Sequence, residues 1–184
     1  MTKVCRAFLL LIVAIFFAAC SSPEPRHPIS RKTHESIDAS IALRTSINQS
    51  EIEAINQLIA KDSTQTYINS NKGFWYAYKV DNNNDYKPKF GDLVEYIYQI
   101  EDLDSKIIYS FDEIGVRTYA IDQQDLEEGL REAVKTLSEG EEAIFLFPSF
   151  KMHSFGGDRK KIRPLQSLKI VLKLLKINIK NENS

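Results

Sequence analysis

The chain has 184 residues, with 24 Lys and Arg against 25 Asp and Glu, and its formal net charge is −1. This balance argues against a basic nucleic-acid-binding surface, so no nucleic-acid partner is expected. Hydrophobic residues make up 43% of the chain, which argues against disorder throughout. Both cysteines, Cys5 and Cys20, lie in the first twenty residues, which excludes a thiol nucleophile or a cysteine-based zinc site elsewhere. We expect no metal and no cofactor.

Residues 1–19 are predicted to form a signal peptide, because Lys3 and Arg6 precede a short apolar run over residues 7–19. A membrane-spanning helix needs about 20 apolar residues, so a retained anchor is the less favoured alternative. The run ends in Phe17-Ala18-Ala19-Cys20, which resembles a bacterial lipobox. This resemblance implies that Cys20 is lipidated and holds the protein in the membrane. The Ser21 that follows resembles an outer-membrane sorting pattern, which implies a periplasm-facing protein of the cell envelope.

Residues 20–48 are predicted to form an extended tether, since Pro23, Pro25 and Pro28 alternate with polar residues. A helix is expected within residues 49–70, because Ser50 to Glu53 match a capping box. An apolar stripe follows at helical spacing, formed by Ile52, Ile55, Leu58 and Ile59. Two interpretations of this stripe remain open: it packs on the following domain, or it pairs with another chain in an oligomer.

Residues 71–179 are predicted to form one α+β domain, followed by a tail over residues 180–184. Strands are expected over residues 74–80, 93–100, 106–109, 117–121, 142–147 and 167–177. One amphipathic helix is expected where Leu126, Leu130, Val134 and Leu137 recur at helical spacing. Short turns join most strands, which favours an antiparallel twisted sheet wrapped around this single helix, with the N-terminal helix before it.

Five phrases of this domain together resemble the FKBP-type peptidyl-prolyl cis/trans isomerases. In order they are FGDLVEY (90–96), KIIYS (106–110), DQQDLEEGLREAV (122–134), LSEGEEA (137–143) and SLKIVLKLL (167–175). The tether, the N-terminal helix and the phrase Gly73-Phe74-Trp75-Tyr76 look closest to the gliding-motility-associated lipoprotein subgroup of Bacteroidetes.

The resemblance implies a prolyl pocket between the sheet and the helix. Tyr96, Tyr109 and His153 are implied as catalytic or substrate-orienting donors. Substrate contacts are implied for Tyr96, Ile108, Leu126, Glu127, Leu130, Phe155 and Ile170. The chain departs from the family pattern at Leu130, where a Trp is usual, and at Tyr109, where an Asp is usual. The implied pocket is apolar but poor in aromatic residues, which points to weak activity.

The implied function is a lipid-anchored prolyl isomerase that assists the folding of exported envelope proteins, including those of the gliding machinery. Rotation about an X–Pro bond faces a barrier of about 18–20 kcal/mol, because amide resonance must be broken. A dry apolar cleft suits the twisted amide better than the planar one and needs no cofactor. The implied partners are proline-containing polypeptides. Two alternatives are a non-catalytic chaperone or binding module that uses the same cleft, and a structural component of an envelope complex.

Overall fold

The computed structural model describes residues 34–152 and 156–180. The chain divides into two units between residues 39 and 40, and the unit that begins at Ser40 contains the whole sheet. The helices are α2 (His34–Lys61), α3 (Phe111–Ile114) and α4 (Glu128–Thr136), with a 3₁₀ turn, η1 (Ser149–Lys151). The strands are β1 (Ile68–Asn69), β2 (Trp75–Val80), β3 (Leu93–Glu101), β4 (Ile107–Tyr109), β5 (Arg117–Ala120), β6 (Glu142–Phe147) and β7 (Leu168–Asn178).

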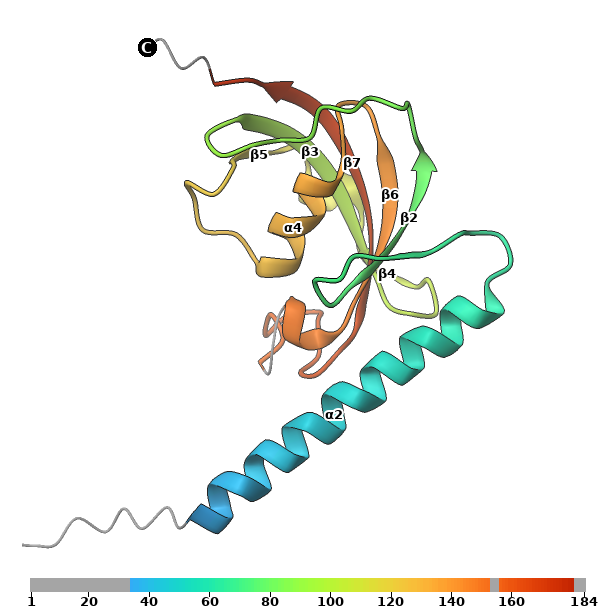
Figure 1. Ribbon diagram of the computed structural model, residues 1–184, viewed down its shortest axis with the longest axis vertical. Coiled ribbons are helices and arrows are strands. Elements are labelled where there is room, and N and C mark those ends of the chain that lie inside the picture. Colours follow the sequence, from blue (N-terminus) through green and yellow to red (C-terminus); the bar gives the residue numbers. More distant parts are fainter. Residues whose placement is uncertain (1–33, 153–155, 181–184) are drawn as a thin grey trace, which may run out of the picture. The chain divides into compact units, whose positions relative to one another are not determined.

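The seven strands form one antiparallel sheet in the order β1-β2-β6-β7-β3-β4, and β5 also pairs with β3 (Figure 1). One edge of β3 pairs with β7 along its whole length. The other edge is shared, since β5 pairs with residues 93–96 and β4 pairs with residues 100–101. Residues 97–99 therefore lie in a gap between the two short strands. The predicted α+β class with an antiparallel sheet is confirmed.

Helix α4 covers one face of the sheet (Figure 1). The side chains of Leu130, Ala133 and Val134 on this helix and of Leu137 at its C-cap are buried, none more than 3% exposed. Alternate residues of β7 meet them from the sheet, namely Leu168, Ile170, Leu172 and Leu174, all fully buried. The predicted helical and strand periodicities are thus confirmed. The helix itself begins at Glu128, so Leu126 lies in the segment that leads into it.

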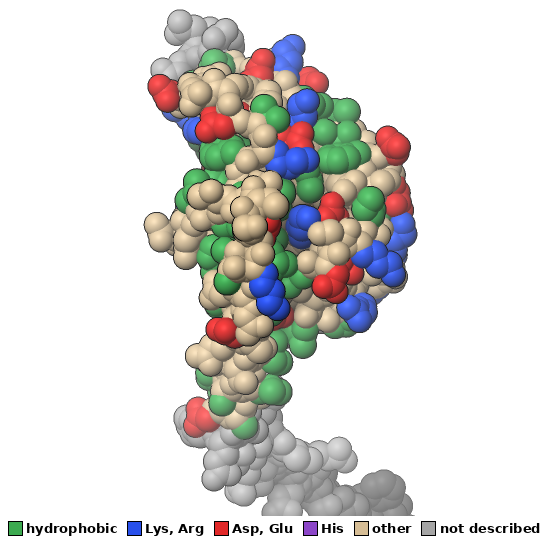
Figure 2. Space-filling view, turned by 90° about the vertical axis from the view of Figure 1, so that its right-hand side faces the viewer, with side chains coloured by type: hydrophobic (Ala, Val, Ile, Leu, Met, Phe, Trp, Pro, Cys, Tyr) green, Lys and Arg blue, Asp and Glu red, His purple; other side chains and the backbone are tan. Residues whose placement is uncertain are grey.

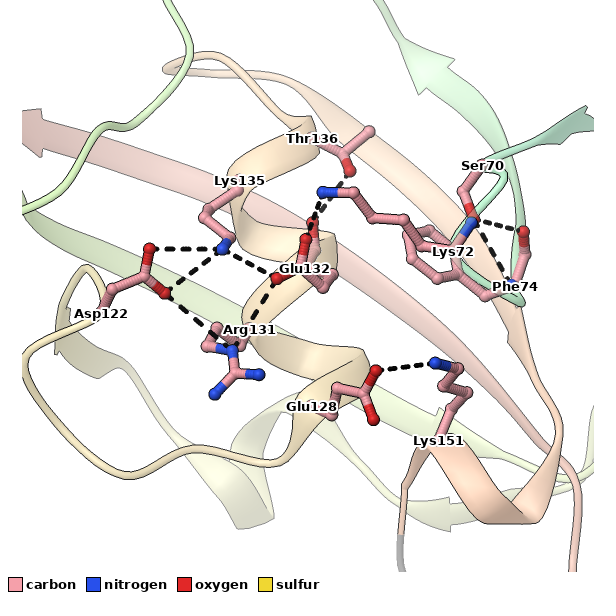
Figure 3. A network of polar contacts seen from close by, with 10 residues as sticks. All are labelled: Ser70, Lys72, Phe74, Asp122, Glu128, Arg131, Glu132, Lys135, Thr136 and Lys151. Atoms are coloured by element: carbon pink, nitrogen blue, oxygen red, sulfur yellow. Dashed lines mark hydrogen bonds and ion pairs between the residues drawn. The ribbon is translucent and has the colours of Figure 1, made fainter.

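Ion pairs fix the outer side of α4 to its neighbours (Figure 3). Glu132 pairs with Lys72, which lies in the turn between β1 and β2, and with Lys135 at 2.7 Å. Lys135 also contacts Asp122 at 3.2 Å, in the loop that follows β5. Partly exposed pairs of this kind contribute about 0–1 kcal/mol each, so their main effect is to orient the helix.

Within the second unit, residues 40–61 of α2 pack on the opposite face of the sheet. Ile55 is fully buried and clusters with Ile144 and Leu146 of β6 and Val171 of β7. Along each strand these positions alternate with those that face α4, as expected for a sheet covered on both faces. The apolar stripe of the N-terminal helix therefore packs on the domain, as in the first of the two interpretations.

The prediction that this helix starts at Ser50 is wrong, because α2 begins at His34. Ser50 lies inside the helix, where its hydroxyl donates to the carbonyl of Ile47 at 2.8 Å. A serine hydroxyl can bond the preceding helical turn, so a serine is tolerated in a helix interior as well as at a cap. Residues 34–49 contain no Gly or Pro that would stop a helix. The predicted tether over residues 20–48 is therefore helical from His34 onward.

Among residues 34–152 and 156–180, no helix combines the length and the apolar character needed to cross a bilayer. On the face of the molecule shown in Figure 2, acidic and basic side chains are interspersed with apolar ones. This mixture agrees with the near-zero net charge of the chain.

Candidate functional site

A cavity of about 330 Å³ opens beside β3, with walls from β4, the start of β5, α3 and the connection between β6 and β7. Its apolar lining consists of Tyr98, Ile100, Ile114 and Ile162. Its polar lining consists of Tyr109, Glu113, Arg117 and Asp158. An apolar hollow with a few polar groups is the usual composition of a site for a small organic group.

Tyr98, which the sequence analysis did not single out, takes the cavity-lining position expected for Tyr96. The two rings stack with centroids 5.8 Å apart and an interplanar angle of 20°. Tyr98 is half-buried and lines the cavity, whereas Tyr96 is only 3% exposed. Burial raises the pKa of the Tyr96 hydroxyl, so this group remains a protonated donor at neutral pH. Within the described ranges the Tyr96 hydroxyl has no hydrogen-bond partner.

The hydroxyl of Tyr109 donates to the carboxylate of Asp158 across the cavity. Asp158 also accepts backbone N–H groups of residues 160, 161 and 162 at 2.8–3.0 Å. Desolvation opposes ionisation of this carboxylate, but these hydrogen bonds outweigh it and lower the pKa of Asp158 to about 2. The bond to Asp158 in turn raises the pKa of Tyr109. The proton of Tyr109 is thus engaged within the protein.

Two cations differ in how they are partnered at the cavity. The ammonium of Lys161 lies over the Tyr109 ring, 4.6 Å from its centroid, and bonds to the carboxylate of Glu113. Arg117 lines the same cavity, and its guanidinium forms no ion pair with any residue of the described chain. Arg117 is therefore the available cationic donor at this site.

The other predicted site residues that the structure describes do not line this cavity. Leu130 and Ile170 are core residues, 3% and 0% exposed. Ile108 lines a second cavity, described below. Leu126 and Glu127 line a third hollow before α4, with Asp125 and Glu128. Of the predicted residues that the structure describes, only Tyr109 lines the 330 Å³ cavity.

Three predicted positions, Cys20, His153 and Phe155, lie outside the described residues. Their assignments as lipidation site, donor and substrate contact stay predictions. Over the described ranges, no group of three or more His, Cys, Asp and Glu side chains is arranged to hold a metal ion.

Sequence reasoning missed seven residues of this cavity, namely Tyr98, Ile100, Glu113, Ile114, Arg117, Asp158 and Ile162. Tyr98 was within reach, because residues two apart on a strand point to the same face, as Tyr96 and Tyr98 do here. Asp158 and Ile162 lie in a long connection, and no periodic signal marks which of its residues return to the sheet. Arg117 opens a short strand whose pairing with Tyr96 could be read only from the fold.

Comparison with known proteins bears on the fold. No protein-family model matches the chain, and no curated protein matches it. Among solved structures it is similar to the crystal structure of the three FKBP domains of wheat FKBP73, with 20% sequence identity and a TM-score of 0.53. The match covers 61% of this chain and 48% of that chain, so this chain spans about half the length of that structure. The domain therefore has an FKBP-like α+β fold.

Proposed function

We propose that the protein is a peptidyl-prolyl cis/trans isomerase whose active site is the cavity beside Tyr98. The observation that carries this proposal is an apolar hollow, formed by Tyr98, Ile100, Ile114 and Ile162, on an FKBP-like sheet. A prolyl ring that enters it removes its own apolar surface and that of the walls from water. Burial of apolar surface stabilises such a complex by about 25 cal/mol per Å².

Catalysis requires that the twisted amide be bound more tightly than the planar one. The planar amide carries separated charge that water stabilises, and an apolar hollow removes that stabilisation. Arg117 supplies a cationic hydrogen-bond donor, because it lines the cavity and forms no ion pair within the described chain. In the proposed mechanism Arg117 donates a hydrogen bond to the substrate, and Tyr109 and Asp158 hold the connection that carries Ile162.

A proline-limited refolding assay with the full chain in detergent tests the proposal. The wild type is expected to accelerate the slow phase. Ile114→Ala removes apolar surface from the cavity and is expected to reduce the acceleration about tenfold. Ile179→Ala is the matched control, because Ile179 is 57% exposed and does not line the cavity. A slow phase as slow as in buffer would reject isomerase activity.

A non-catalytic binding module is the second candidate, and one observation favours it. Tyr96, Leu130 and Ile170 are at most 3% exposed. A substrate held against Tyr98 would not contact these three residues. The site would then lack the substrate contacts that the resemblance implies for an isomerase. Binding of Leu-Pro peptides without faster isomerisation would support this candidate over the first.

We further propose that the protein acts in the cell envelope, anchored through lipid on Cys20. The lipobox-like sequence supports this, and two or more acyl chains would anchor it stably where one would not. Metabolic labelling with a fatty-acid analogue tests it, and Cys20→Ser should abolish incorporation. The resemblance of residues 73–76 to the gliding-motility-associated lipoproteins supports the proposal that the clients include proteins of the gliding machinery. The proposed lipid anchor would be ruled out if the protein were recovered in the soluble fraction without the fatty-acid label.

A further inference from the structure

A second cavity, of about 580 Å³, adjoins the first. It is lined by Asp102, Lys106, Ile107, Ile108, Lys161, Arg163 and Gln166. The two cavities meet at one contact, because Lys161 lines the second cavity and lies over the ring of Tyr109, which lines the first. A chain segment bound in one cavity would therefore continue into the other along β4.

The charge of the second cavity is mainly positive. Lys106 and Arg163 form no ion pair with any side chain in the described ranges, whereas Lys161 is paired with Glu113. The one acid of the lining, Asp102, accepts backbone N–H groups of residues 104 and 106 at 3.0 and 2.9 Å and so is engaged in its own turn. Two unpaired cations thus face a space that a carboxylate could enter.

The lining of this cavity also includes two apolar residues. Ile107 is 54% exposed and Ile108 is half-buried, and both line the cavity. Strand residues advance about 3.3 Å each, so Lys106 and Tyr109 lie about 10 Å apart along the chain. An extended peptide covers the same span in about three residues. Apolar lining residues beside unpaired cations fit a polypeptide with an acidic side chain better than they fit a small anion.

We propose that the second cavity selects X–Pro segments that carry an Asp or Glu about three residues from the proline. This inference rests on the proposed function, because it places the proline in the first cavity. Lys106 and Arg163 bind the carboxylate, and Ile107 contacts the residues between it and the proline. The clients are therefore acidic proline-containing segments.

The test uses the full chain in neutral detergent and Leu-Pro peptides with Glu, Gln or Lys three residues before or after the proline. NMR titration measures affinity, and exchange spectroscopy on the same samples measures isomerisation. In one of the two peptide sets the Glu peptide is expected to bind about fivefold more tightly than the Gln peptide, and the Lys peptide more weakly than both. The difference should shrink at about 0.5 M salt.

The variant Lys106→Gln/Arg163→Gln should abolish the Glu preference and leave affinity and isomerisation of the Gln peptide unchanged. Lys173→Gln/Lys176→Gln is the matched control, because both lysines are exposed on β7 and have no ion pair within the described chain. Equal affinities of the three peptides in both sets, or a Glu preference that survives Lys106→Gln/Arg163→Gln, would overturn the inference. The inference would also be overturned if Lys106→Gln/Arg163→Gln, but not the control, lost binding to phosphatidylglycerol vesicles while no preference among the peptides was found.

The same samples separate this inference from the proposed function. Discrimination among the peptides without isomerisation would reject the enzyme and support the selective cavity. Isomerisation without discrimination would reject the selective cavity and support the enzyme.

Discussion

The carboxylate of Glu51 on α2 accepts two hydrogen bonds from Ser149, one from its backbone N–H and one from its hydroxyl, both at 2.7 Å. Glu51 is 9% exposed and Ser149 is 3% exposed, so both groups are largely shielded from water. Ser149 opens η1, at the start of the β6–β7 connection that also contains the cavity residues Asp158 and Ile162. The N-terminal helix is thus hydrogen-bonded to the start of the connection that contributes these two lining residues.

Removing this carboxylate should destabilise the domain. Glu51→Ala leaves the buried N–H of Ser149 without an acceptor, and the free energy of unfolding should fall by about 2 kcal/mol. Urea unfolding of the full chain in detergent, followed by circular dichroism, measures it. Glu53→Ala is the control on the same helix, because Glu53 is exposed, and it should change stability by less than about 0.5 kcal/mol. Equal effects of the two variants would contradict the role of Glu51.

The buried Ile55 should contribute more to α2 docking than any exposed isoleucine of the same helix. Ile55→Ala opens a space against Ile144 and Val171 and is expected to cost about 2–4 kcal/mol. Ile41→Ala, at a position 59% exposed, should be nearly neutral in the same urea experiment. A small effect of Ile55→Ala would mean that α2 does not pack on the sheet in solution.

Gly129 is required where the start of α4 passes the β6–β7 connection. A Cβ at this position would lie 2.7 Å from the Sδ of Met152 and 2.9 Å from the carbonyl oxygen of Lys151. Gly129→Ala gains helix propensity, but the backbone carbonyl cannot move aside easily, and a net loss of about 1–3 kcal/mol is expected. The control is Gly156→Ala, because nothing lies within 4 Å of that Cβ. Thermal unfolding of the two variants measures the difference. A Gly129→Ala variant that is more stable than the wild type would show that Gly129 is not packed closely against Lys151 and Met152.

The pH dependence of stability should report the Tyr109–Asp158 pair. The folded-state pKa of Asp158 is lowered from 3.8 to about 2, so its contribution is present above pH 3.8 and is lost as the pH falls toward 2. Asp158→Asn should flatten the stability profile in this window.

The variant Tyr109→Phe should raise the pKa of Asp158 toward its ordinary value, measured by carboxyl-carbon NMR titration. Tyr86→Phe removes a similar hydroxyl from Asp92, elsewhere in the domain, and should leave the titration of Asp158 unchanged. An Asp158 pKa that does not respond to Tyr109→Phe would show that the pair does not form.

The sheet and α4 could be predicted because their patterns are local. Alternate residues from Leu168 to Leu174 are apolar, and those between them include Lys169 and Lys173, while Leu130 to Leu137 recur at helical spacing. Burial on the α4 side therefore follows from the period alone. The start of α2 could not be predicted, because Ser50 and Glu53 match the pattern of a capping box although they lie inside a continuous helix. Most residues of the cavity could not be predicted either. Asp158 meets Tyr109 only after a long connection folds back, and pocket residues taken from a resemblance, such as Ile170, lie in the core.

Exchange spectroscopy on a Leu-Pro peptide with catalytic amounts of the full chain tests the central claim most directly. The account predicts that cis–trans exchange of the peptide is accelerated by the wild type and by Ile179→Ala. It predicts an acceleration about tenfold smaller for Ile114→Ala. An exchange rate equal to that of the free peptide, or equal rates for Ile114→Ala and the wild type, would contradict isomerisation in the cavity beside Tyr98.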